Sequence, residues 1–360
     1  MCSTFIVKPV GSSCNLSCSY CYFQEKDEKG SFKKMSKENL KIFFNLFCVK
    51  KINNIIWHGG EPLLAGIDFY KQVVKIQSKL SGNKKFLNFI QTNGALINSD
   101  WINFFNENNF LVGVSLDGPK RFHDETRKSK NGKSNFNKTV NSINELKNAG
   151  VLTDVICCIS KTNYLHPKEI FYFFVNNGIK RIKFLQVQGR YSDGRLQPGS
   201  ISGEDYFKFL LTIFNEWIKY DDPNIEVREI NSIVSLLLGG VPGDCMFAGK
   251  CHDYLTIYSD GSVYACDSLS DSEDMKFGYI NDGLNKVQSS DNFKRFRKRT
   301  EEIRSGCMGC YYFKICRGGC LQDWWPDIYK KETMNYFCSG MNKLFVEIEK
   351  KLNRYNLIEK

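Results

Sequence analysis

Three cysteines near the N-terminus have the spacing of an iron–sulfur cluster site. Cys14, Cys18 and Cys21 form a C-x3-C-x2-C motif in a polar loop that follows an apolar run at residues 5–10. Cysteine thiolates hold [4Fe–4S] clusters, and a cluster with three protein ligands keeps one iron open to a small molecule. A structural zinc site is the alternative, but such sites take four ligands and no fourth lies nearby. We therefore predict a cluster with one chemically open iron.

A second concentration of cysteines lies toward the C-terminus. Eight of the fifteen cysteines fall in this part of the chain: Cys245, Cys251, Cys266, Cys307, Cys310, Cys316, Cys320 and Cys338. The first residues show no secretory signal, and a reducing cytosol disfavours disulfides, so we expect these thiols to bind metal.

Short β-rich runs alternate with amphipathic stretches in the first half of the chain. We predict strands at residues 5–10, 54–57, 86–91, 111–116, 154–160 and 180–186, and helices at 37–48, 67–80, 100–107, 135–148 and 167–177. Ser36 and Ser99 are expected to cap two of these helices. This alternation predicts an α/β fold in which six β/α units form an incomplete barrel around a parallel sheet. The loops at the C-terminal ends of the strands, where Cys14 lies, would carry the chemistry.

The composition changes beyond a further predicted helix at 203–220. Gly-rich residues 239–243 mark a boundary, after which cysteines and short strands around 254–258 and 263–265 dominate. We therefore predict a core domain at 1–235, a small cysteine-rich domain at 236–340 and a C-terminal helix at 341–360.

The net charge decides little about partners. The formal charge is +11 at pH 7, but the lysines are spread along the whole chain, as on an ordinary solvated surface. We see no appended nucleic-acid module and no apolar run of about 18 residues. We therefore expect a cytoplasmic protein that acts on neither nucleic acid nor membrane.

The loops after the predicted strands resemble those of the radical S-adenosylmethionine (SAM) superfamily. Residues 59–62, Gly-Gly-Glu-Pro, follow the second strand like the family's GGEP motif, and residues 91–94, Gln-Thr-Asn-Gly, follow the third. The resemblance implies a partial (β/α)6 radical SAM barrel whose open iron binds SAM and cleaves it to a 5′-deoxyadenosyl radical. It also implies a set of SAM-contact residues: Phe23, Gly59, Gly60, Glu61, Thr92, Asn93, Ser115 and Arg127.

From Cys251 onward the cysteine spacing resembles the SPASM domain of peptide and protein maturases. The resemblance implies two auxiliary [4Fe–4S] clusters, hence three in all, with zinc as the alternative metal. Cys245, Cys251, Cys266 and Cys320 would hold the first auxiliary cluster, and Cys307, Cys310, Cys316 and Cys338 the second. Because both clusters would have four protein ligands, they are expected to relay electrons.

Asp267 follows Cys266 and matches the position of a general base in the sulfatase maturases, although an ordinary turn aspartate is the alternative. Two reactions remain open. Sulfatase maturases oxidise Cys or Ser to Cα-formylglycine, whereas maturases of ribosomally synthesised peptides form cyclophane or thioether cross-links. We favour cross-linking, because His58 stands where the sulfatase enzymes have Gln and residues 251–269 read more like the peptide-cyclising enzymes.

The expected partners follow from this resemblance. The substrate would be a peptide or protein, and reduced flavodoxin or ferredoxin would supply electrons. A separate leader-binding protein is expected as well, because no leader-binding module precedes Cys14. A non-enzymatic iron–sulfur or zinc scaffold is the alternative of another class, but it does not explain a three-ligand cluster site combined with GGEP.

Overall fold

The structure is a computed structural model that describes residues 4–21, 33–80, 82, 84–189, 195–270, 273–325 and 333–357. The chain divides into two compact units, each built from three segments. The first unit comprises residues 1–115, 127–153 and 252–298, and the second comprises 116–126, 154–251 and 299–360. The domain boundaries expected at 235 and 340 stay predictions.

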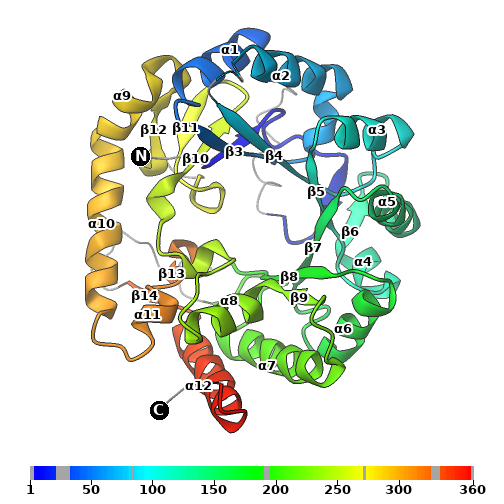
Figure 1. Ribbon diagram of the computed structural model, residues 1–360, viewed down its shortest axis with the longest axis vertical. Coiled ribbons are helices and arrows are strands. Elements are labelled where there is room, and N and C mark those ends of the chain that lie inside the picture. The colour runs from blue at the N-terminus through cyan, green and yellow to red at the C-terminus, as the bar shows by residue number, and fades with distance from the viewer. Residues whose placement is uncertain are drawn as a thin grey trace. The chain divides into compact units, whose positions relative to one another are not determined.

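A mostly parallel sheet runs through the first unit (Figure 1). Its strands are β1 (Thr4–Lys8), β3 (Ile52–Trp57), β4 (Lys85–Thr92), β5 (Leu111–Ser115), β10 (Tyr254–Tyr258), β11 (Ser262–Tyr264) and β12 (Lys276–Tyr279). They pair in the order β12-β11-β10-β1-β3-β4-β5. The five from β10 to β5 are parallel neighbours, whereas β11 and β12 continue the sheet antiparallel. A separate antiparallel pair joins β2 (Leu16–Cys18) to β6 (Arg127–Ser129).

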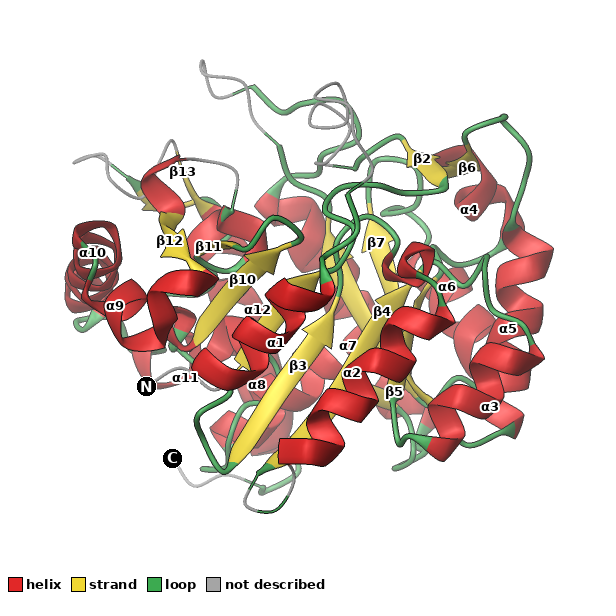
Figure 2. Ribbon diagram, turned by 90° about the horizontal axis from the view of Figure 1, so that it is seen from above, coloured by secondary structure: helices red, strands yellow, loops and turns green. Residues whose placement is uncertain are grey.

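Helices cover one side of these strands. They are α1 (Lys37–Leu46), α2 (Ile67–Leu80), α3 (Ser99–Glu107), α5 (Phe136–Asn148) and α9 (Gly283–Ser289). Figure 2 shows α2 running beside β3 and β4. Aromatic side chains fill the space between: the ring of Tyr70 packs edge-to-face on Trp57 at 5.4 Å, on Trp101 at 5.6 Å and on Phe110 at 6.0 Å.

The second unit has its own parallel strands: β8 (Arg181–Gln186), β9 (Glu226–Val227) and all but the first two residues of β7 (Leu152–Ile159). Its helices are α4 (Lys120–Thr126), α6 (Pro167–Asn176), α7 (Gly203–Tyr220), α8 (Arg228–Leu237), α11 (Phe313–Cys316) and α12 (Cys338–Arg354), and β13 (Trp324–Trp325) pairs with β14 (Met334–Asn335). Helix α7 packs against both α6 and α12. Helix α10 (Asp291–Cys307) begins in the first unit and ends in the second.

The predicted α/β class and its parallel strands are confirmed. All six predicted strands are present, as β1, β3, β4, β5, β7 and β8, and the predicted helices appear as α1, α2, α3, α5, α6 and α7. The terminal helix begins three residues earlier than predicted, at Cys338, and ends at Arg354. The parallel pairing of β10 with β1 and the helices α8 and α10 were not predicted.

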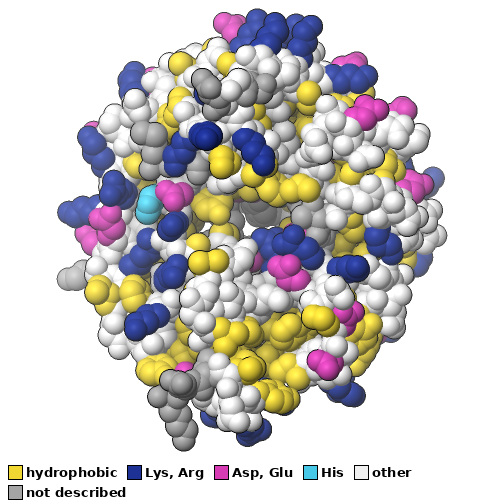
Figure 3. Space-filling view, in the orientation of Figure 1, with side chains coloured by type: hydrophobic (Ala, Val, Ile, Leu, Met, Phe, Trp, Pro, Cys, Tyr) yellow, Lys and Arg dark blue, Asp and Glu magenta, His cyan; other side chains and the backbone are white. Residues whose placement is uncertain are grey.

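Charged side chains of both signs are distributed over the face drawn in Figure 3. Lys and Arg predominate on this face, and Asp and Glu lie among them. Within the part of the chain that the structure describes, no helix is both long and apolar enough to cross a bilayer.

Candidate cluster and cofactor site

The loops that follow β1 and β3 pack backbone against backbone in the first unit. The amide of Gly60 donates to the carbonyl of Gly11 at 3.0 Å, and the amide of Glu61 donates to the carbonyl of Ser13 at 2.8 Å. A Cβ on Gly60 would lie only 2.1 Å from the carbonyl oxygen of Ser13. Gly59 has a φ of +121°, and its Cβ would lie 2.6 Å from the carbonyl oxygen of Gly11. Both glycines therefore permit the close approach that fixes the cysteine loop.

Glu61 joins the loop after β3 to the end of β4. Its side chain is fully buried. The carboxylate accepts hydrogen bonds from the amide of Leu63 at 3.0 Å, the hydroxyl of Thr92 at 2.8 Å and the amide of Asn93 at 2.8 Å. Burial raises the pKa of this carboxyl, and the three hydrogen bonds oppose the rise. A carboxylate has about four acceptor positions, so the expected contact with a SAM amino group would have to use the remaining one.

The three N-terminal thiols affect one another's ionisation. Burial raises the pKa of Cys14 to about 12, and negative charge on Cys18 and Cys21 adds to the rise. The sulfur of Cys14 also accepts contacts from the amide of Leu16 at 3.4 Å and from the side-chain amide of Asn93 at 3.8 Å. Thiols that crowd one another in this way ionise together only beside a cation, which an iron cluster provides. The three residues therefore fit the cluster that their spacing predicts.

The other predicted SAM-contact residues have different surroundings. Ser115, the last residue of β5, accepts a hydrogen bond from the side-chain amide of Gln91 at 3.1 Å. Arg127 is buried and lies beside the cysteine loop, because it pairs with Cys18 between β2 and β6 and its guanidinium lies 5.5 Å from the ring centre of Tyr20. Their contacts with SAM stay predictions. Phe23, another of the predicted SAM-contact residues, lies outside the described residues.

Asp267 forms a buried ion pair in the first unit. Lys8, the last residue of β1, is fully buried, and its ammonium group contacts the Asp267 carboxylate. The Nδ1 atom of His58 lies 3.0 Å from the other carboxylate oxygen. Burial alone would raise the pKa of Asp267, but the charge of Lys8 and the contact with His58 outweigh it and hold the pKa well below its usual range. Asp267 is therefore an ionised carboxylate at neutral pH, a form that can accept a proton, although its lowered pKa makes it a weaker base than an unpaired carboxylate.

Lys8 was not predicted as a functional residue, although the sequence carries a signal for it. Lys8 is the one cation in the run Phe5-Ile6-Val7-Lys8, whose other residues are all apolar. A charged residue that ends a buried strand requires a partner, because an unpaired buried ammonium group is costly. That partner is the residue predicted to act as the base.

The four cysteines predicted for the second auxiliary cluster lie together in the second unit. Burial raises the pKa of Cys316 to about 12, and the negative charges of Cys338, Cys307 and Cys310 add to the rise. Burial also raises the pKa of Cys307, again with contributions from Cys338 and Cys310. These four thiols therefore influence one another electrostatically, and the grouping that the resemblance implies fits a site for a four-thiolate cluster.

Three of the four cysteines predicted for the first auxiliary cluster belong to the second unit, and Cys266 belongs to the first. Burial raises the pKa of Cys251, and the amide of Leu321, which follows Cys320, opposes the rise by a hydrogen bond. This contact brings the chain at Cys320 close to Cys251. Among the described residues, no three Cys, His, Asp or Glu side chains are already arranged around one metal position.

Comparisons with known proteins place the chain in a family. Residues 9–173 match the family model "Radical SAM superfamily", and residues 245–311 match SPASM, "Iron-sulfur cluster-binding domain". The chain is 32% identical to the cysteine-type anaerobic sulfatase-maturating enzyme of Clostridium novyi, an alignment that covers 99% of this chain and 97% of that enzyme. It is 33% identical to the serine-type enzyme of Bacteroides thetaiotaomicron, with 95% and 88% covered.

A solved structure agrees with this relationship. Native anSMEcpe with bound AdoMet and the Cp18Cys peptide has a TM-score of 0.89 and 28% identity to this chain, and 98% of each chain is covered. SuiB from Streptococcus suis bound to S-adenosylmethionine has a TM-score of 0.60 and 15% identity, with 89% and 73% covered, which shows the fold alone.

These findings identify a radical SAM enzyme and correct the expected reaction. The cross-linking of a ribosomally synthesised peptide is not supported, because the relatives aligned over nearly their whole length are sulfatase-maturating enzymes of both types. The glutamine-to-histidine difference at His58 was therefore a poor guide to the reaction, since a single residue at a site can differ among related enzymes.

Proposed function

This chain belongs to the family of anaerobic sulfatase-maturating enzymes, and we propose that it oxidises a Cys or Ser residue of a sulfatase to Cα-formylglycine. Cys14, Cys18 and Cys21 would hold the cluster that binds SAM. Bound there, the cluster and SAM supply a 5′-deoxyadenosyl radical able to remove a hydrogen atom from an unactivated carbon. The loop contacts of Glu61 and Asn93 keep the cysteine loop in place for this chemistry.

The oxidation removes two electrons and two protons from the substrate residue. For Ser this gives the aldehyde directly, whereas for Cys it gives a thioaldehyde that water hydrolyses to the aldehyde with release of hydrogen sulfide. One electron and one proton leave together as the hydrogen atom, so the second proton needs a base and the second electron needs an acceptor. We assign the base to Asp267, which Lys8 keeps ionised. The eight C-terminal cysteines would hold the two auxiliary clusters that accept the electron.

One observation supports this proposal above the others. The carboxylate of Asp267 is buried, ionised and paired with Lys8 and His58, and Lys8 ends the strand that leads into the cysteine loop. A turn aspartate needs no buried cation, whereas a base that must take a proton from a radical intermediate has to be held in place and in its charged form.

Partners follow from the same chemistry. We propose a sulfatase or a peptide from it as substrate, and reduced flavodoxin or ferredoxin as the donor of the electron that starts SAM cleavage. The separate leader-binding protein belonged to the cross-linking hypothesis and has no place in this proposal.

The test is an anaerobic assay with two synthetic peptides that span the modified residue of a sulfatase, one carrying Cys and the other Ser. After reconstitution with iron and sulfide, the enzyme should convert at least one of the two to an aldehyde, detected by mass spectrometry and by capture with a hydrazide. A peptide with the modified residue replaced by Ala is the control and should stay unchanged. A product that has lost two hydrogens but carries no aldehyde would support cross-linking and overturn the proposal.

A further inference from the structure

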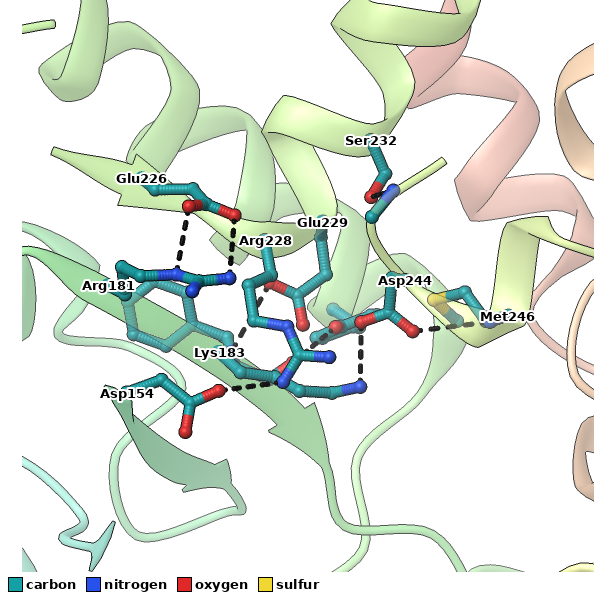
Figure 4. A network of polar contacts seen from close by, with 12 residues as sticks. Asp154, Arg181, Lys183, Glu226, Arg228, Glu229, Ser232, Asp244 and Met246 are labelled. Atoms are coloured by element: carbon teal, nitrogen blue, oxygen red, sulfur yellow. Dashed lines mark hydrogen bonds and ion pairs between the residues drawn. The ribbon is translucent and has the colours of Figure 1, made fainter. Parts of the chain in front are cut away.

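A network of charged side chains surrounds the segment just before Cys245 in the second unit (Figure 4). Lys183 on β8 has a side chain that is 14% exposed, and its ammonium nitrogen lies 2.7 Å from Oδ2 of Asp244, whose side chain is 1% exposed. The other oxygen of Asp244 accepts a hydrogen bond from the amide of Met246 at 3.2 Å. Asp244 is thereby the N-cap of the 3-10 turn Cys245–Phe247. Lys183 therefore holds the residue from which the Cys245 turn starts.

Helix α8 supports the same segment. The hydroxyl of Ser232 accepts a hydrogen bond from the amide of Gly243, one residue before Asp244, at 3.1 Å. At the first position of the helix, Arg228 pairs with Asp154 of β7 at 2.9 Å. The network thus rests on two strands and one helix, elements rigid enough to fix the turn.

The two buried carboxylates of the network, Glu229 and Asp244, differ in their hydrogen-bond and ion-pair partners. Burial raises the pKa of Glu229 to about 7. Its Oε2 accepts a hydrogen bond from the amide of Phe184 at 3.3 Å, whereas its Oε1 has no hydrogen-bond partner among the described residues. The side chain of Asp244 is 1% exposed, and the ammonium group of Lys183 pairs with it at 2.7 Å. Removing that cation would leave a buried carboxylate with less compensation, which is costly.

Lys183 lies at the segment that carries Cys245, because its partner Asp244 directly precedes that cysteine in the chain. A cluster ligated by four thiolates is an anion that gains negative charge on reduction, so a buried cation beside it stabilises the reduced form.

We propose that Lys183 is a positioning residue for the first auxiliary cluster. Lys183 holds Asp244 and thereby the turn that presents Cys245. Its positive charge also keeps the reduction potential of that cluster higher than it would be beside the neighbouring carboxylates alone. Groups outside the ligand shell tune metal centres in this way. The inference rests on the ligand set of the proposed function and is independent of which sulfatase residue is modified.

The test measures reduction potentials by EPR-monitored titration in a parent protein with Cys14, Cys18 and Cys21 changed to Ala, so that only the auxiliary clusters contribute. Lys183→Met should lower the reduction potential of one auxiliary cluster. If that cluster is lost instead, the protein should keep only about four of its about eight irons. Asp244→Asn keeps an acceptor for the Met246 amide but leaves Lys183 unopposed, so the potential should shift upward. The double variant should return toward the parent value.

Two further variants complete the design. Lys183→Arg keeps the charge and should restore the parent potential. Arg181→Met is the matched control, because it removes an exposed ion pair with Glu226, 2.9 Å long, from the same strand, and it should shift neither cluster. If Lys183→Met does not fold, the upward shift in Asp244→Asn still tests the sign.

Unchanged potential and full iron content in Lys183→Met, or shifts of the same sign in both single variants, would overturn this inference and leave the proposed function intact. A parent that binds no iron at the auxiliary cysteines would instead overturn the ligand set on which the proposed function depends.

Discussion

Lys8 shows how a single buried charge can organise a site. Its side chain has no exposed surface, yet its ammonium group has several partners: the Asp267 carboxylate, the hydroxyl of Tyr258 at 2.9 Å and the hydroxyl of Ser270 at 3.4 Å. It also lies 4.4 Å from the centre of the Tyr258 ring. All these partners come from the segment between β10 and the residues just after Asp267. The lysine therefore ties β1 to the segment that carries the proposed base.

Lys8→Met should destabilise the protein and leave part of Asp267 protonated, so that it cannot accept the second proton. Removing one partner of a buried ion pair leaves the other charge unpaired, which costs about 3 to 5 kcal/mol. Without the cation, burial should raise the pKa of Asp267. We expect a lower urea midpoint with an unchanged slope, and less formylglycine per SAM cleaved. Lys8→Met combined with Asp267→Asn should recover much of the lost stability, since no charge is then left unpaired. A single variant as stable as the parent would contradict this account.

The same pair predicts how stability depends on pH. The pKa of Asp267 is lower in the folded protein than in the unfolded chain, so its contribution to stability is fully present above the unfolded value of about 4. It is lost as the pH falls further, through the lower folded value. Between neutral pH and strong acid, the parent should therefore lose more of its stability than Lys8→Met combined with Asp267→Asn does.

At the scale of elements, local patterns were predictable and long-range pairings were not. Ser36 was expected to begin the first helix, and its side chain does accept a hydrogen bond from the amide of Asn39 at 3.0 Å. At the helix near residue 100, the cap is Asn98 instead of the expected Ser99, because both residue types can cap and only the backbone geometry distinguishes them.

The pairing of β10 with β1 had no local signal. Thr4 pairs with Tyr254, and these two residues lie about 250 positions apart in the chain. Apolar alternation identifies a strand but not its neighbour. This pairing places Asp267 beside Lys8. A role for Asp267 could be proposed from the family resemblance, whereas its ion pair with Lys8 could not. Helix α10 was missed for another reason: its few apolar residues, such as Phe293 and Phe296, lie among many charges.

A crossing between α7 and α12 gives a prediction at this scale. Gly340 follows Cys338 by two residues on α12, and a Cβ there would lie 2.3 Å from the carbonyl oxygen of Gly203. Gly340→Val should push α12 away from α7 and displace Cys338. We expect a lower melting temperature and the loss of roughly four irons per chain, as one cluster would be released. The exposed neighbour provides the control, and Ser339→Ala should keep both. Full iron content in Gly340→Val would contradict the predicted displacement of Cys338.

At the scale of the whole molecule, cysteine spacing was the most informative feature of the sequence. Two groups of cysteines that the spacing predicts also interact electrostatically in the folded chain. They are Cys14 with Cys18 and Cys21, and Cys316 with Cys307, Cys310 and Cys338. Closely spaced ligands predict well because a short loop can place them on one metal. The substrate was less predictable, because the fold supports several reactions and the difference rests on few residues.

The division of labour among the clusters can be tested in the complete enzyme. Reconstituted protein should hold roughly twelve irons per chain. Cys14→Ala should lower this number by roughly four and abolish 5′-deoxyadenosine, because the open iron would be lost with its cluster. Asp267→Asn should keep the iron and the SAM cleavage but lose the aldehyde product, because the amide cannot take the second proton.

Three quantities therefore separate the roles: iron content, 5′-deoxyadenosine and aldehyde. An Asp267→Asn variant that forms aldehyde at the parent rate would remove this residue from the mechanism. Zinc in place of iron at the C-terminal cysteines would leave the second electron without an acceptor. In that case SAM cleavage would persist without aldehyde even though Asp267 is intact, so the loss of product alone would not identify the base. The iron measurement must accordingly accompany the assay of every variant.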